Sequence, residues 1–316
     1  MNVQIEQTYK ARDVEEKIDL LFYRPVGFRI ALAARRLGLT PNTITYISIA
    51  LGVFAGHFFF YDSIHLYLIG IGIWVIANAF DSADGQLARM TNSSTEFGRI
   101  IDGMGGNFIF FSIYFHVCLR HALNDGFFGW WIFPIALTAG ACHAVQSAMA
   151  DLYRQGYIRY GVDATKGELT YSLIIRKEYE QARFWENPFR KFFLRVYLNF
   201  TTQQEQLSPQ FQRFRAYVDE TFGQAIPAEL SARYRTLNKP LLKYYNYMTI
   251  NGRVMTFFAF ILIGYPEIFF FVEILLMSLL LWAVLHRQER NNTILTEEAM
   301  RLAATPVVPD QWRAIA

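Results

Sequence analysis

The chain has 316 residues, of which 53% are hydrophobic and 17% are aromatic, and its mean hydropathy of +0.16 is high for a soluble protein. The formal net charge is only +3 at pH 7, so the basic residues suit a membrane surface better than a nucleic acid. Composition therefore argues against a water-soluble globular protein and against a nucleic-acid-binding protein.

The N-terminal element, residues 1–42, has the pattern of an amphipathic helix over residues 13–37. Apolar Ile18 and Leu21 alternate with basic side chains such as Lys17. This pattern is typical of a helix that lies on a membrane surface.

Apolar residues gather in six runs, each near the roughly 20 residues that a helix needs to cross a bilayer. Residues 43–150 contain four of the runs, and residues 251–286 contain the other two. The runs are Thr43–Tyr61, Ile64–Phe80, Ile100–Leu119, Phe127–Ala150, Arg253–Tyr265 and Ile268–Leu285.

Lysine and arginine lie mainly in the connections at one end of the predicted spans. Basic residues precede the first run, follow the second and the sixth, and are frequent in residues 151–250, whereas the opposite turns carry only Arg120. The positive-inside rule then places both termini and the loop after the second run in the cytoplasm. The predicted fold is an all-α integral membrane protein with six transmembrane helices, a cytoplasmic helical insert (151–250) and a polar C-terminal tail (287–316).

Three helices are predicted within the insert. Residues Lys177–Tyr197 have helical periodicity. A second helix begins at Ser208-Pro209, with a capping hydroxyl and a proline at the first helical position, and Gly223 ends it. Pro227 opens the third.

The strongest functional signal lies at the end of the second apolar run. Carboxylates near hydrocarbon are costly unless they bind something, and carboxylate oxygens suit Mg²⁺ or Mn²⁺. Residues three apart share a helix face, so the first two carboxylates project the same way. Acidic residues, small residues and one arginine recur there in the order Asp81, Asp84, Gly85, Ala88, Arg89, Gly98 and Asp102.

This segment closely resembles the signature of the CDP-alcohol phosphotransferases, D-x2-D-G-x2-A-R-x8-G-x3-D-x3-D. The resemblance implies transfer of a phospho-alcohol group from a lipid donor to a hydroxyl acceptor, with two divalent cations, Mg²⁺ or Mn²⁺, in a homodimeric membrane enzyme. It implies that Asp81, Asp84 and Asp102 are metal ligands. It also implies that the nucleotide site is formed by Gly85, Ala88, Arg89, Gly98 and Thr45, the last of which belongs to a Pro41-Asn42-x-x-Thr45 segment typical of the family.

One position departs from the signature. Gly106 stands where the family has its last Asp, which helps to hold the metals and acts as the general base. Asn107 points about 100° away on a straight helix, and an amide cannot act as a base. Three alternatives follow: a relative that binds nucleotide or lipid without turnover, a transferase whose base lies elsewhere, or related chemistry on a different donor.

A second polar face lies on the fourth apolar run. By about 100° per residue, its members fall within about 140° of one another. His143 is the candidate relocated base or nucleophile, and Ser147, Asp151 and Arg154 are candidate phosphate or acceptor ligands. The alternative is a structural hydrogen-bond ladder. The face consists of His143, Gln146, Ser147, Asp151 and Arg154.

The sequence thus predicts a membrane lipid phosphotransferase of phospholipid or sphingolipid synthesis. Phe22-Tyr23-Arg24-Pro25 and the long insert resemble a bacterial branch of the family associated with inositol lipids and sphingolipids. That resemblance implies a location in the bacterial inner membrane, and a phosphoinositol group transferred to ceramide. The competing hypotheses are a non-catalytic relative and a metal-dependent lipid phosphodiester hydrolase.

Overall fold

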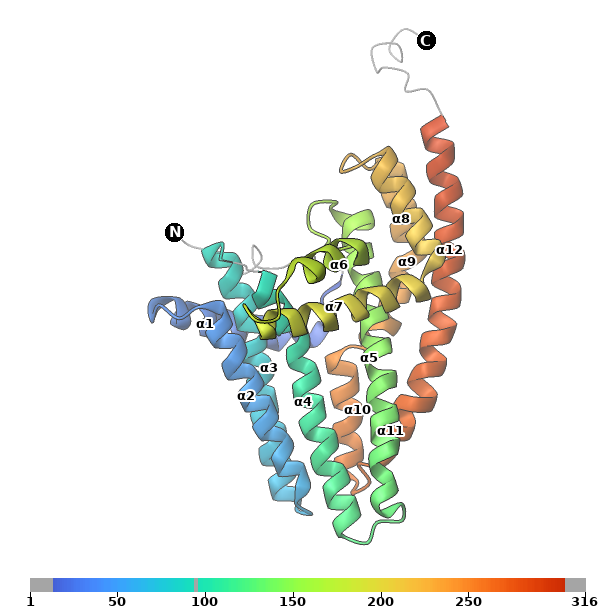
Figure 1. The fold of residues 1–316 in the computed structure, drawn as a ribbon. Coiled ribbons are helices and arrows are strands. Elements are labelled where there is room, and N and C mark those ends of the chain that lie inside the picture. The colour runs from blue at the N-terminus through green and yellow to red at the C-terminus, as the bar shows by residue number, and fades with distance from the viewer. Residues whose placement is uncertain (1–13, 94–95, 305–316) are drawn as a thin grey trace.

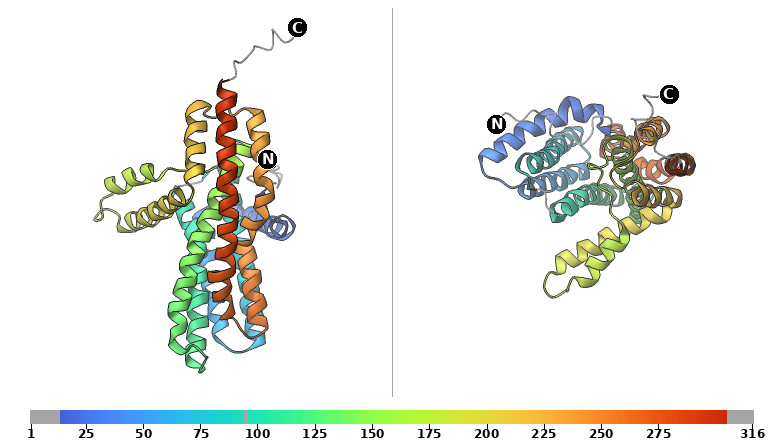
Figure 2. Two further views of the ribbon diagram at one scale, coloured as in Figure 1. Left: turned by 90° about the vertical axis from the view of Figure 1, so that its right-hand side faces the viewer. Right: turned by 90° about the horizontal axis from the view of Figure 1, so that it is seen from above.

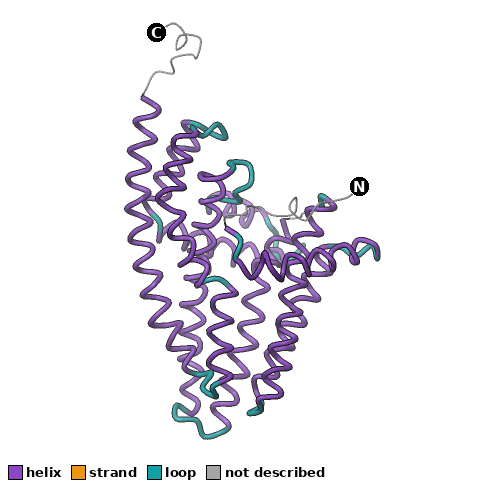
Figure 3. The backbone as a smooth tube through the Cα atoms, turned by 180° about the vertical axis from the view of Figure 1, so that it is seen from behind, coloured by secondary structure: helices purple, strands orange, loops and turns teal. Residues whose placement is uncertain are grey.

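The computed structural model describes residues 14–93 and 96–304, and helices account for all regular structure in those ranges (Figure 3). Three helices contain π-helical turns, at Asp19–Tyr23 before α1, Tyr157–Val162 after α5, and Val272–Met277 between α11 and α12. The helices are α1 (Arg24–Arg36), α2 (Pro41–His57), α3 (Ile64–Thr91), α4 (Glu96–Leu123), α5 (Ile132–Gly156), α6 (Ser172–Gln181), α7 (Pro188–Leu207), α8 (Pro209–Thr221), α9 (Ala228–Tyr247), α10 (Ile250–Leu262), α11 (Ile268–Phe271) and α12 (Ser278–Ala304).

The long helices form a bundle with a helical cap at one end. Helices α2, α3, α4, α5 and α10 run lengthwise through the bundle. Helices α8 and α9 lie beside the C-terminal half of α12 (Figure 1). Helix α1 and the α6–α7 hairpin lie across the bundle axis and project on opposite sides of it (Figure 2). Their position marks the junction between the bundle and the cap.

Four helical segments are long and apolar enough to cross a membrane: Pro41–Phe60, Ile64–Thr91, Gly129–Val162 and Ile268–Ala304. They overlap the first, second, fourth and sixth predicted spans. Helix α10 has 13 residues, so it is about 20 Å long, shorter than the roughly 30 Å hydrocarbon core of a bilayer.

Glycines allow the helices around the motif to pack closely. A Cβ atom on Gly27 of α1 would lie 3.0 Å from Ser82 Oγ of α3. A Cβ atom on Gly56 of α2 would lie 2.5 Å from Ser112 Oγ of α4. The motif helix α3 is therefore held against α1, and α2 against α4, at backbone distances that a larger residue would prevent.

The insert begins and folds differently from its prediction in three places. Helix α5 continues past residue 150 to Gly156, and the predicted helix Lys177–Tyr197 is split into α6 and α7 by a break at residues 182–187. Ser208 precedes α8 as predicted, but its hydroxyl donates to the Gln204 carbonyl oxygen at 2.6 Å and does not cap the helix.

A carboxylate from another helix caps α8. Glu289 of α12 accepts hydrogen bonds from the backbone amides of Gln210 (2.7 Å) and Phe211 (3.2 Å), and from the Tyr153 hydroxyl at 2.9 Å. A negative charge at the N-terminal end of a helix also complements the helix dipole. This contact explains why the polar residues after Leu285, predicted as a tail, continue α12 as a helix to Ala304.

We expect Glu289→Ala to destabilise the cap. The substitution leaves the Tyr153 hydroxyl and two α8 amides without their acceptor, which should cost about 2 kcal/mol. Thermal unfolding of purified protein in detergent measures the loss. Glu297→Ala, on the exposed face of the same helix, is the matched control, and an equal effect of both substitutions would contradict the capping role.

Candidate functional site

The motif residues lie in the last turns of α3 and the first turns of α4. Asp84 on α3 is 4% exposed and accepts a 2.6 Å hydrogen bond from the Thr45 hydroxyl of α2. One turn before it, Asp81 is half-buried. Thr45, predicted as part of the nucleotide site, thus orients one of the predicted metal ligands.

The small motif residues leave room for the arginine. The guanidinium of Arg89 lies over Gly85, where a Cβ atom would be 3.4 Å from Arg89 Nη2. Ala88 is half-buried beside it, and Gly98 lies in the first turn of α4. The side chain of Asp102 falls outside the described part of the structure, although its backbone is helical within α4.

A cavity of about 280 Å³ opens beside Asp81. It brings together Asp81 and three of the polar residues predicted on α5, namely Ser147, Asp151 and Arg154. Asn78, one turn before Asp81 on α3, also lines it. The remaining lining comes from segments that the sequence analysis did not connect with the motif: Glu16, Asp19, Thr249, Ile250 and Asn251.

Hydrogen bonds join the N-terminal segment to other residues that line this cavity. The Thr249 hydroxyl donates to Glu16 Oε1 at 2.7 Å, and the Asn251 amide donates to Asp19 Oδ1 at 2.9 Å. Arg154 Nη2 donates to the Val14 carbonyl oxygen at 3.1 Å. The N-terminal segment is therefore fixed against α5 and against the start of α10.

The pKa of the Glu16 carboxyl is raised above its ordinary value. Burial is the largest cause, and the nearby charge of Asp19 acts in the same direction, while the Thr249 hydrogen bond and the charge of Arg154 oppose it. Glu16 therefore holds a proton more readily than a solvent-exposed glutamate does.

His143 lies on the same helix but outside this cavity. It is 7% exposed, with its Nδ1 atom 3.4 Å from the Tyr114 hydroxyl and 3.9 Å from Glu273 Oε1, and its ring is packed edge-on against Phe110. The structure thus places the predicted base in the protein interior, apart from Asp81, Ser147, Asp151 and Arg154.

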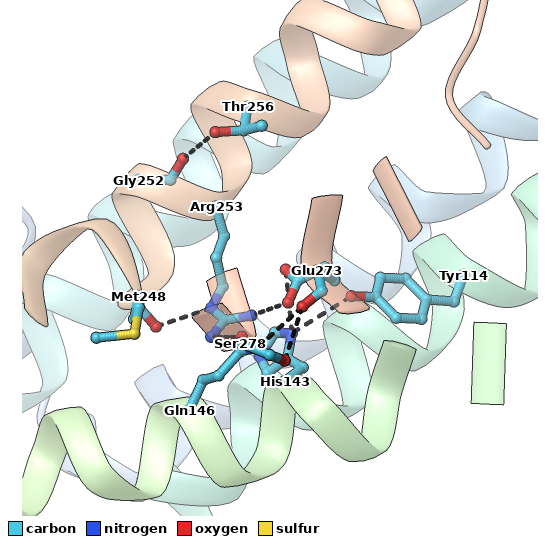
Figure 4. Close-up of polar contacts among 9 residues, drawn as sticks. All are labelled: Tyr114, His143, Gln146, Met248, Gly252, Arg253, Thr256, Glu273 and Ser278. Atoms are coloured by element: carbon cyan, nitrogen blue, oxygen red, sulfur yellow. Dashed lines mark hydrogen bonds and ion pairs between the residues drawn. The ribbon is translucent and has the colours of Figure 1, made fainter. Parts of the chain in front are cut away.

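His143 belongs to a fully buried polar cluster (Figure 4). Arg253 of α10 and Glu273 are both 0% exposed and form a direct ion pair. Gln146 accepts a 2.8 Å hydrogen bond from Arg253 and donates a 2.9 Å hydrogen bond to the Glu273 carbonyl oxygen. Arg253 also donates to the Met248 carbonyl oxygen at 2.8 Å. These contacts join α5, α10 and the helix that continues as α12.

Hard oxygen donors at Asp81 and Asp84 fit a divalent cation such as Mg²⁺ or Mn²⁺. Within the described residues, no group of three histidine, cysteine or acidic side chains is close enough to hold a metal ion. The third predicted ligand, Asp102, is not among the side chains described.

Comparison with known proteins bears directly on the motif. Residues 38–166, from the end of the N-terminal element through α5, match the sequence model of the CDP-alcohol phosphatidyltransferase family. This part of the chain is therefore similar to a CDP-alcohol phosphatidyltransferase domain. The insert and helices α10–α12 lie outside the match.

Two similar proteins carry names from inositol lipid synthesis. The chain is 37% identical over 73 residues to a phosphatidylinositol phosphate synthase of Mycobacteroides abscessus, covering 23% of this chain and 32% of that protein. It is 28% identical over 141 residues to an archaetidylinositol phosphate synthase of Pyrococcus horikoshii, covering 44% of this chain and 70% of that protein. The chain thus spans about a third of the mycobacterial relative's length. No solved structure matches it significantly.

The sequence offered a signal for the acidic lining of the cavity. Glu16 and Asp19 are three residues apart in the predicted N-terminal helix, so they share one face. Asn251 likewise stands at the start of an apolar run. Only the folded structure shows that these residues meet Asp81.

We expect Arg253→Met to destabilise the domain strongly, because it leaves the Glu273 carboxylate buried without its partner. Loss of one member of a buried pair costs about 3–5 kcal/mol. The double substitution Arg253→Met/Glu273→Leu should recover most of that loss, since it removes both charges. Thermal unfolding in detergent measures both, with Arg290→Met on the exposed face of α12 as the control. A single variant as stable as the wild type would contradict this assignment.

Proposed function

We propose that this protein is a membrane lipid phosphotransferase that transfers a phospho-alcohol group onto a hydroxyl acceptor and releases CMP. The observation that carries the proposal is the juxtaposition of Asp81, a residue of the family motif, with Ser147, Asp151 and Arg154 in one cavity. Such a cavity offers carboxylates for cations and a guanidinium for an anionic substrate group.

Asp81, Asp84 and Asp102 are the residues we propose to hold two divalent cations. When bound, such ions neutralise the charge of a diphosphate. The chain itself would supply orientation: the Thr45 hydroxyl bonds the Asp84 carboxylate, and we propose that Arg89, whose guanidinium lies beside Gly85, binds a phosphate. Ala88 and Gly98 are small, and we propose that they leave room for a nucleotide to approach.

We further propose that the product is an inositol lipid. The names of both relatives point to inositol phosphate groups joined to a lipid. Arg154, Ser147 and Asp151 line the cavity together, and we propose that they bind the acceptor's polar group. A phosphoinositol transfer to ceramide is the variant of this reaction that the N-terminal resemblance favours.

In the membrane, we propose six spans, with α4 and α10 completing the four long apolar segments. The cavity and both termini then face the cytoplasm of a bacterial inner membrane, in accord with the distribution of basic residues. Helix α1 and the α6–α7 hairpin, which lie across the bundle axis (Figure 2), would rest on the membrane surface. The hairpin exposes large apolar side chains that suit this position: Leu173, Phe184, Trp185, Phe189 and Phe192. The homodimer implied by resemblance is part of the same proposal.

The decisive experiment measures CMP release by the purified protein. The protein is incubated with Mn²⁺, CDP-diacylglycerol or a CDP-alcohol, and inositol, inositol phosphate or ceramide. We expect acceptor-dependent CMP release, reduced at least about 100-fold by Asp84→Asn because a ligand of the cations is lost. Asp125→Asn, at the opposite end of the bundle, is the matched control.

The outcomes separate the candidate functions. Binding of CDP without turnover on any donor would indicate a non-catalytic relative, the candidate that Gly106 favours. Release of a free phospho-alcohol without an acceptor would indicate a hydrolase.

We also expect Thr45→Val to weaken Mn²⁺ binding about 10–100-fold, as loss of a ligand-orienting hydrogen bond does in other metal sites. Electron paramagnetic resonance of free Mn²⁺ measures the affinity directly. Thr138→Val removes an exposed hydroxyl that bonds only within its own helix, and it should leave the affinity unchanged. Equal affinities for Thr45→Val and wild type would contradict the role of Thr45.

A further inference from the structure

The position of the absent carboxylate lies next to a residue that lines the cavity. A Cβ atom on Gly106 would lie 3.7 Å from Ile250 Cδ1, an ordinary contact, and Ile250 lines the cavity. Position 106 can therefore accept a side chain without a clash, yet glycine presents no acid there. If the reaction takes place in this cavity, its proton acceptor must come from elsewhere.

The N-terminal segment brings two other carboxylates into the same space. Glu16 and Asp19 line the cavity together with Asp81. An ion pair between Glu15 and Arg24, at 2.8 Å, holds the segment from its other side. Glu15 is not part of the cavity lining. Glu15 therefore anchors the segment to Arg24, whereas its neighbour Glu16 lines the cavity.

Glu16 fits the role of proton acceptor better than the other acids. It is half-buried, and the Thr249 hydroxyl donates to its Oε1 atom, with the Asn251 side chain as a second neutral hydrogen-bond partner. Asp151 is exposed and accepts a hydrogen bond from Gln155 of its own helix. His143 lies outside the cavity, against Tyr114 and Glu273.

We propose that Glu16 is the general base for the acceptor hydroxyl, in place of the carboxylate absent at position 106. This assignment rests on the proposed phosphotransfer. The hydroxyl proton passes to a carboxylate oxygen of Glu16, and the hydroxyl oxygen forms a bond to phosphorus. The bond between phosphorus and the CMP oxygen breaks, and CMP leaves with the electron pair.

The surroundings of Glu16 support this chemistry. The charged groups that face it are Asp19 on its own segment, Asp81 on α3, and Asp151 and Arg154 on α5. Burial and Asp19 raise the pKa of Glu16, which brings a carboxylate nearer to the working pH and makes it a stronger base.

The test uses the purified full-length protein with Mn²⁺ and a CDP-linked lipid donor. We expect Glu16→Gln to lower kcat by about 100-fold or more, within the range for loss of a general base, with donor KM and Mn²⁺ affinity within about threefold of wild type. Glu15→Gln, which removes the neighbouring carboxylate, should keep kcat within about fivefold. The double variant Glu16→Gln/Gly106→Asp should regain at least about tenfold in kcat over Glu16→Gln, because it restores an acid at the other border of the cavity.

Each contrary result has a distinct meaning. A Glu16→Gln enzyme with a kcat close to wild type overturns the base assignment and leaves the phosphotransferase intact. Equal losses in Glu15→Gln and Glu16→Gln, or a loss of Mn²⁺ affinity in Glu16→Gln, overturn it in favour of a structural role. Failure of Gly106→Asp to rescue the double variant overturns the idea that one carboxylate replaces the other. A wild type that releases no CMP with any donor overturns the proposed function and the base together.

Discussion

The buried ion pair between Arg253 and Glu273 is the contact on which the rest of the bundle depends. Both side chains are fully buried, so neither charge can recover water if the other moves. Gln146 binds both partners and thereby fixes the rotation of α5, whose next residue, Ser147, faces the cavity. Arg253 also holds the Met248 carbonyl, just before Thr249 and Asn251 reach the N-terminal carboxylates. This buried pair thus helps to position two segments that line the cavity, α5 and the start of α10.

Local patterns in the sequence predicted the parts of the molecule that local forces determine. The apolar runs became helices, Gly223 follows α8 with a φ of 57°, and the spacing of Asp81 and Asp84 placed both on α3. The polar α5 residues Ser147, Asp151 and Arg154 share one face because helical periodicity requires it.

Long-range contacts were beyond the reach of those patterns. Residues after Leu285 look like a solvent-exposed tail until Glu289 is seen to cap α8, and Gln288 to bond Asn238 of α9 at 3.0 Å. Glu16 and Thr249 are 233 positions apart in the chain, so no periodicity links them. His143 shows the limit most clearly: the same helical face carries it and Ser147, but Tyr114 and Glu273 pack around it and separate it from the cavity.

Gly106, in place of the last acid of the motif, changes the direction from which a carboxylate can approach the cavity. A carboxylate on α4 would approach the cavity from one border, next to Ile250, whereas Glu16 approaches from the N-terminal segment. In the phosphotransfer proposed above, the acceptor hydroxyl would therefore approach phosphorus differently than in relatives with a complete motif. Such an arrangement would allow a different acceptor, with the proposed donor residues Asp84 and Arg89 unchanged.

The hydrogen bonds from Thr249 and Asn251 to the N-terminal carboxylates also have a consequence for biosynthesis. The matched family domain ends at residue 166, but the cavity beside it has no complete wall until the ribosome has passed Asn251. Nascent chains therefore contain the whole motif well before all the residues that line the cavity have been made. Synthesis of the start of α10 is the step that completes the cavity lining.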